Sequence, residues 1–163
     1  MTSRSIHRMA SASLTSADTI AGYRWNVRAW ACDRDDFRDF VLTRIDRIKP
    51  GPAADFDPAD DLEWENFAKL DLWPHPGPTE EQSLAIQRDY ATKDGRCEID
   101  VRLSMAYYFS MRMNLNLPDL PPAHAQICLS NIDEVRKAIE DAKAGSKARI
   151  LKRKGQSDGP DAG

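Results

Sequence analysis

The sequence predicts an α+β protein made of two small modules, on three observations. Two runs rich in Trp, Val, Phe and Ile, residues 23–32 and 37–45, flank the short charged segment 33–36, which is typical of a β-hairpin. A stretch of prolines and aspartates then interrupts the chain. Beyond it, a strand-like alternation is followed by a helix start signal. We therefore expect a β module followed by a mixed α/β module.

The composition fits a soluble globular protein. The 163 residues are 41% hydrophobic and 30% charged, which suits one ordinary domain or two small ones. Apolar runs fall short of the ~20 residues of a membrane helix, and no secretory signal is evident. We therefore expect a cytoplasmic protein with no membrane contact. Cys32, Cys97 and Cys128 are far apart and odd in number, which argues against a disulfide framework or a zinc site.

The charge is uneven along the chain, although the net charge is only −3. Counting Lys and Arg against Asp and Glu, residues 1–50 carry nine and six, residues 51–100 four and thirteen, and residues 101–163 ten and seven. An acidic middle between basic ends indicates separate modules, and it does not make the whole chain a polyanion binder.

The two runs of the hairpin each place polar and aromatic side chains on one strand face, because side chains alternate along a strand. These sets are Arg24, Asn26, Arg28 and Trp30 in the first run, and Arg38, Phe40, Leu42 and Arg44 in the second. If the register aligns the two faces, three arginines gather beside two aromatic rings and could hold an anion and stack on a base. The sequence leaves that register open. The alternative is a solvated face on which the arginines pair with neighbouring aspartates.

The hairpin also carries a specific motif. Residues 24–32 read R-W-N-V-R-A-W-A-C, and residues 37–45 read F-R-D-F-V-L-T-R-I after an acidic turn. In type, order and spacing this resembles the core of the WYL-domain family of bacterial transcriptional regulators. Asn26 stands where that family usually has His or Tyr, and Trp30 where it usually has Tyr. The resemblance implies a partial Sm/SH3-like β-barrel over residues 1–49 whose ligand-binding residues are Arg28, Arg38, Arg44, Asn26, Trp30 and Phe40.

Residues 50–61 are predicted to be a linker, since Pro removes donors and acidic residues resist burial. The acidic residues of this region are interpreted as solvated rather than as a metal or acid–base site. The α/β extension then spans residues 62–117. It begins with a helical turn and a strand over 69–73, and the T-E-E-Q capping box at Thr79 predicts a helix over 80–91.

The part of this extension after residue 95 gives two conflicting signals. Apolar residues alternate strictly from residue 99 to 115, as in a strand, but typical strands have about five or six residues. We favour a strand over 96–101 followed by a helix over 102–114, which would be buried nearly all round.

The C-terminal part is predicted as a Pro-rich segment and a helix, residues 118–145. The helix would run over 132–144, with Asn131 as its cap and Gly145 at its end. Residues 146–163 are predicted to be a disordered tail, because they cannot bury enough apolar surface.

The extension also resembles that of WYL regulators with a C-terminal extension, a subgroup commonly linked to phage-defence operons. The matching elements are Trp64, the strand 69–73, Pro74-His75-Pro76, Gln82, Arg88-Asp89-Tyr90, Asp94-Gly95, Val101-Arg102 and Tyr108. Together the two blocks cover residues 23–117. In the family an R-x-I-x-P-H-x-L strand comes earlier, faintly echoed at residues 4–7, and a winged helix-turn-helix precedes it.

The resemblance implies the ligand-sensing and dimerisation part of a transcriptional regulator that lacks its winged helix-turn-helix. The implied effector is an anionic nucleotide or a single-stranded nucleic acid, and DNA would be bound only through a missing or partner helix-turn-helix. A homodimer is expected, because the apolar run 103–117 exceeds what a small extension can bury alone. No catalytic motif is evident, so we predict that the chain is not an enzyme and needs no cofactor. The alternative function is a free-standing protein-interaction module without ligand or DNA-binding activity.

Overall fold

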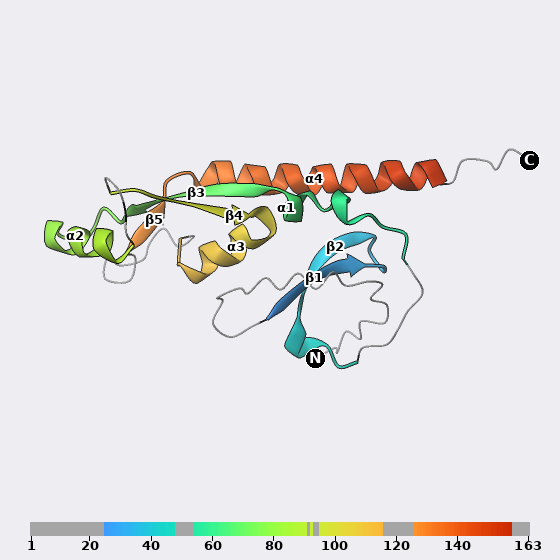
Figure 1. The fold of residues 1–163 in the computed structure, drawn as a ribbon, viewed down its shortest axis with the longest axis horizontal. Coiled ribbons are helices and arrows are strands. Elements are labelled where there is room, and N and C mark those ends of the chain that lie inside the picture. The colour runs from blue at the N-terminus through green and yellow to red at the C-terminus, as the bar shows by residue number, and fades with distance from the viewer. Residues whose placement is uncertain (1–24, 48–53, 91, 93–94, 116–125, 158–163) are drawn as a thin grey trace, which may run out of the picture. The chain divides into compact units, whose positions relative to one another are not determined.

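The computed structural model describes residues 25–47, 54–90, 92, 95–115 and 126–157 (Figure 1). It is an α+β protein, as predicted, with a two-stranded sheet, a three-stranded sheet and several helices. The chain divides into two compact units. The first unit combines residues 1–62 with residues 143–163, and the second unit spans residues 63–142.

The first unit contains the predicted hairpin. β1 (Asn26–Ala31) pairs antiparallel with β2 (Asp36–Val41), and the chain turns between them with a positive φ of 52° at Asp35. The second strand ends earlier than predicted, because Leu42–Arg44 form the 3-10 turn η1. The two strands are what the described residues contain of the barrel predicted for residues 1–49. The faint family strand at residues 4–7 lies outside the described residues.

The acidic segment that follows is more ordered than the predicted solvated linker. η2 (Pro58–Asp60) is capped by Asp57, whose carboxylate accepts a hydrogen bond from a backbone N–H of the turn. Asp60 and Asp61 are both buried. Buried carboxylates are tolerated when they are paired, and both of these aspartates have an arginine partner. Residues 48–53 of the predicted linker lie outside the described residues.

The C-terminal helix is much longer than predicted. α4 runs over Ile132–Ser157 and passes through Gly145, where the sequence predicts its end. Ser146 and Ile150 are buried within the stretch predicted to be a disordered tail, and the Ser146 hydroxyl accepts from the Leu62 backbone N–H at 2.9 Å. The prediction of a disordered tail is therefore wrong for residues 146–157. Residues 158–163 lie outside the described residues.

The core of the first unit explains why this helix continues. Trp30, Phe37 and Ile150 form a buried cluster, and Phe56 packs against it. The rings of Trp30 and Phe56 stack at 5.6 Å, while Phe37 meets Trp30 edge-on at 5.0 Å. The apolar surface that orders the last turns of α4 is thus supplied by residues about a hundred positions earlier in the chain, which the composition of the tail cannot reveal.

The second unit is built on an antiparallel sheet in the order β4-β3-β5. Its strands are β3 (Phe67–Pro74), β4 (Cys97–Arg102) and β5 (Ile127–Leu129), preceded by α1 (Leu62–Glu65). Alternate residues of the central strand β3, namely Ala68, Leu70 and Leu72, are buried. The other face of β3 is polar or exposed, so the sheet has one core face.

Two predicted helices of this unit are confirmed. α2 (Glu80–Asp89) starts at the predicted capping box, in which Thr79 Oγ1 accepts from the Gln82 N–H and the Gln82 side chain accepts from the Thr79 N–H. α3 (Leu103–Arg112) follows β4 directly, so this region is a strand and a helix rather than one long strand. α3 packs on β3 and β4 (Figure 1). Asp94 of the predicted turn and the Pro-rich residues 118–122 lie outside the described residues.

Candidate functional site

The register of the hairpin divides the residues expected on one ligand surface. The Cα partners include Arg28 with Asp39 and Trp30 with Phe37. Directly opposed residues project from the same face of a sheet. One face therefore carries Asn26, Arg28, Trp30, Phe37, Asp39 and Val41, and the other carries Val27, Ala29, Arg38 and Phe40. The expected single surface of Arg28, Arg38 and Arg44 is thus wrong, because the side chains alternate against this register.

Arg28 is buried in the first unit, where it is paired with aspartates. Its Nε donates to Asp61 Oδ2 at 2.5 Å, its Nη2 donates to Asp61 Oδ1 at 2.8 Å, and its Nη1 donates to Asp39 Oδ1 at 3.3 Å. Arg28 is only 8% exposed and Asp61 only 4%. A bidentate arginine–carboxylate pair already uses the fork that would recognise a phosphate. A ligand on Arg28 would first have to displace Asp61.

Three further predicted ligand residues lie in different surroundings. Trp30 is buried and stacked on Phe56, so its ring faces the core. Arg44 is exposed in η1, after the end of the strand, where strand alternation no longer applies. Asn26 is half-buried on the face of Arg28. Ligand binding by these three residues stays a prediction, because Trp30 is buried and Arg44 lies beyond the strand on which Asn26 and Trp30 would meet it.

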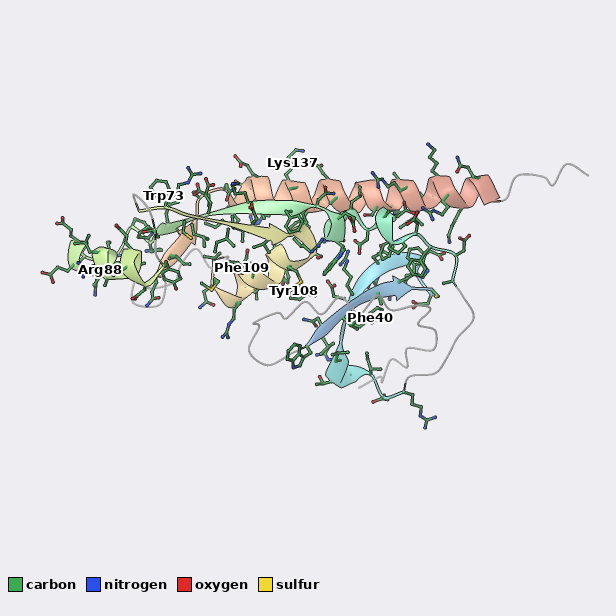
Figure 2. All side chains as sticks on the ribbon, in the orientation of Figure 1. Phe40, Trp73, Arg88, Tyr108, Phe109 and Lys137 are labelled. Carbon is green, nitrogen blue, oxygen red and sulfur yellow. The ribbon has the colours of Figure 1, made fainter. Side chains whose placement is uncertain are left out.

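The opposite face keeps two of the predicted residues together. The Arg38 side chain is 46% exposed, and its carboxylate neighbour Asp36, at 3.3 Å, is equally exposed. Phe40 is half-buried on the same strand (Figure 2). Trp25 joins them, because its carbonyl accepts from the Leu42 N–H at 2.8 Å and so continues the ladder by one position. Trp25 is 56% exposed and diagonal to Phe40 across the strands.

Trp25 is the residue that sequence reasoning missed on this face. The signal was present, because strand parity places Trp25 with Val27 and Ala29 rather than with Arg28. An exposed arginine near an aromatic ring can bind phosphate through its fork while a base stacks on the ring. Trp25, Arg38 and Phe40 are called the arginine–aromatic face below.

Sequence reasoning also missed the partners of the acidic segment. Arg153 Nη2 lies 2.8 Å from Oδ2 of Asp57 and 2.8 Å from Oδ2 of Asp60. The hydrogen bond from Arg153, followed by the backbone N–H of Ala59, lowers the pKa of Asp57. The same hydrogen bond raises the pKa of Arg153. No local pattern could find this contact, since Arg153 and Asp57 are 96 residues apart.

The polar face of the second unit's sheet is held by paired charges. Asp71 accepts from Arg96 Nε and from Ser130 Oγ, both at 2.5 Å. Burial alone would raise the pKa of Asp71, but hydrogen bonds from Ser130 and Arg96 outweigh it and lower the pKa. Arg102 lies over the rings of Trp64 and Phe67, at 4.3 and 4.7 Å from their centroids. These contacts stabilise the sheet and use the charges that could otherwise meet a ligand.

Metal binding, membrane spanning and thiol reactivity are further properties on which the described residues bear. Among them, no group of His, Cys, Asp and Glu side chains could hold a metal ion. No helix of the described chain is both long and apolar enough to cross a membrane. Cys32, Cys97 and Cys128 carry free thiols, and burial raises the pKa of Cys128. A raised pKa makes a thiol a poorer nucleophile at neutral pH.

Comparison with known proteins bears on the second unit above all. Residues 67–135 match the family described as "BrxR transcriptional regulator, C-terminal dimerization domain". The chain is 35% identical over 128 residues to the DNA-binding transcriptional repressor CapW of Stenotrophomonas maltophilia, which covers 76% of this chain and 42% of that protein. It is 37% identical over 122 residues to CapW of Pseudomonas aeruginosa, covering 73% and 40%.

A CapW repressor of Escherichia coli strain KTE188 is 35% identical over 116 residues, or 70% of this chain and 39% of that protein. The chain thus spans about two fifths of the length of the curated relatives it matches. These relatives are regulators rather than enzymes, in agreement with the prediction that this chain is not an enzyme. The second unit is therefore similar to a dimerization domain, and the comparisons support a family of transcriptional regulators of the CapW and BrxR type.

Proposed function

We propose that this chain is the ligand-sensing and dimerisation part of a WYL-type transcriptional regulator associated with phage defence. The observation that carries the proposal is the match of residues 67–135 to a regulator's dimerization domain. The chain would form a homodimer through its second unit. The first unit would be the sensor, with an Sm/SH3-like fold, on the strength of the WYL-like motif in its hairpin. Operator DNA would be bound through a helix-turn-helix outside the described residues or on a partner.

Size-exclusion chromatography with light scattering tests the dimerisation half of this proposal. At tens of micromolar, the full chain should elute with twice the mass of the 18.4 kDa monomer. A dimer in this range would support the proposed function. A monomer throughout that range would contradict it.

We propose further that the effector is an anionic nucleotide or a single-stranded nucleic acid, and that it binds the arginine–aromatic face. Arg38 can release Asp36 at little cost, because exposed ion pairs contribute only about 0–1 kcal/mol. Phe40 and Trp25 offer ring surface for a base, and such stacking contributes about 1–3 kcal/mol per base. Arg28, Trp30, Asn26 and Arg44 are outside this narrower site.

Calorimetric titration of short single-stranded oligonucleotides and cyclic dinucleotides tests the sensing half. Arg38→Ala should weaken binding by about 1.5–3 kcal/mol, as expected for a hydrogen bond to a charged group. Arg38→Lys should not restore it fully, because an ammonium group lacks the planar fork. Affinity should also fall as salt rises.

Arg34→Ala is the matched control, since the Arg34 side chain in the hairpin loop is about as exposed as that of Arg38. Equal affinities of wild type, Arg38→Ala and Arg34→Ala would show that the arginines form a solvated face. If none of the three proteins binds the oligonucleotides or cyclic dinucleotides, the alternative function stands, a protein-interaction module without a ligand. The burial of Arg28 and Trp30 favours this alternative, because it removes two of the expected ligand contacts.

A further inference from the structure

One helix of the second unit exposes the side-chain types that protein interfaces favour. Tyr107 and Met111 of α3 are 57% and 51% exposed. They are four residues apart, so they are neighbours on one side of the helix. The ring of Tyr108 meets that of Tyr107 edge-on at 5.6 Å, and Arg112 follows at the exposed end of α3. Interfaces are enriched in Tyr, Met and Arg, and Arg112 is the single charged residue of α3.

Other residues of α3 attach the helix to the sheet. Leu103, Ala106 and Ser110 are buried where α3 packs on the sheet. Tyr107 follows Leu103 by four residues and Met111 follows Tyr107 by four, so the exposed pair lies on the arc beside the buried residues rather than opposite them. Both side chains are more than half exposed, so another molecule can contact them.

Other exposed apolar side chains of this unit are engaged or isolated. Phe67 lies against the guanidinium of Arg102. Trp73 lies on the same face of β3 as Asp71 and helps to lower the pKa of that carboxyl. Leu84 lies on α2 among polar neighbours, and a single exposed apolar residue is ordinary on a protein surface. The cluster on α3 is the exception.

We infer that Tyr107 and Met111, called the α3 face, form the contact between two copies of this chain. This rests on the proposed function, since it names the surface through which the dimerization domain associates. The two α3 helices would pack antiparallel about a two-fold axis at the level of position 109 along the helix, which is labelled in Figure 2. Tyr107 of each copy then meets the partner's Met111, a favourable sulfur–aromatic contact.

Electrostatics permits this arrangement. At 1.5 Å per residue, the Arg112 residues of the two antiparallel helices are about 9 Å apart along the axis, so they are not directly opposed. An interface of standard size buries about 800 Å² on each partner, which is more than two side chains supply. Tyr107 and Met111 would therefore be the hot spot of a larger contact.

The test compares the full wild-type chain with Met111→Glu by sedimentation over a range of concentrations. A charge in the centre of the contact should weaken dimerisation at least about 30-fold, the level of a hot-spot residue. Leu84→Glu is the matched control, because Leu84 is 47% exposed on another helix of the same unit. The control should dimerise like wild type, and circular dichroism should show that both variants keep the native fold.

A mixture of variants separates docking from folding. Met111→Glu and Met111→Lys should each be monomeric alone and should form a heterodimer when mixed, because the two copies of position 111 are about 6 Å apart along the axis. If wild type and Met111→Glu dimerise equally, the α3 face is overturned while the proposed function stands. A monomeric wild type overturns both. If Met111→Glu unfolds, a folded Tyr107→Gln decides: undiminished dimerisation overturns the α3 face, and weakened dimerisation supports it.

Discussion

Replacing Arg28 with Ala tests whether this arginine belongs to the core or to a ligand site. The Arg28 guanidinium is almost inaccessible and makes a two-point contact with the buried carboxylate of Asp61. The truncation leaves that carboxylate buried without its counter-charge. Removing one partner of a buried pair typically costs about 3–5 kcal/mol. Domain stabilities are about 5–15 kcal/mol, so Arg28→Ala should bring the first unit close to unfolding.

The double variant Arg28→Met with Asp61→Leu provides the internal check. Replacing a buried ion pair by apolar residues of similar volume is often neutral or stabilising. We therefore expect the double variant to recover at least half of the stability that Arg28→Ala loses. The recovery would show that the cost comes from the uncompensated carboxylate rather than from the missing side-chain volume.

Urea denaturation followed by tryptophan fluorescence and circular dichroism measures these changes, since Trp30 is buried in the same unit as Arg28. Arg38→Ala is the control, because its side chain is exposed and its ion pair contributes at most about 1 kcal/mol. The reasoning is refuted if Arg28→Ala loses less than about 1 kcal/mol. Loss of effector binding at unchanged stability would instead assign Arg28 to the ligand.

Three further predictions concern α4 and the acidic segment. Ile150→Ala should cost about 2–5 kcal/mol of unfolding free energy, whereas the exposed Leu151→Ala should be nearly neutral; equal effects would contradict the docking of this helix. Gly155→Ala should raise stability by up to about 1 kcal/mol, since its added Cβ meets open space. Gly145→Ala should gain less in the same urea titration, because its Cβ would come within 2.7 Å of a leucine methyl group. Because the pKa of Asp57 is lowered in the folded state, its contribution to stability is present above the unfolded-state pKa and is lost as pH falls through the folded-state pKa. Asp57→Asn should therefore reduce the difference between the unfolding free energies at pH 3 and pH 7, as measured by urea titration. An unchanged difference would disprove the role of Asp57.

The sequence alone determined the elements whose signals are local. The capping box at Thr79 located the start of α2, since both of its hydrogen bonds join residues three apart. The two β-rich runs around an acidic turn predicted the hairpin. The usual length of strands correctly predicts strand β4 followed by helix α3, where the strict alternation of apolar residues would predict one long strand. In each case the deciding residues lie within a few positions of one another.

Tertiary structure decided what depends on distant partners. The hairpin register sets Arg28 and Arg38 on opposite faces, and a shift of one residue would reverse that placement without changing the composition of either strand. Asp61 becomes a core residue because Arg28 reaches it, not because of its neighbours in the acidic segment. The last turns of α4 are ordered because Ile150 packs with Trp30 and Phe37 in a buried cluster. Burial and ion pairing supply the free energy that a polar, basic tail lacks by itself, and both require contacts made only when the chain folds.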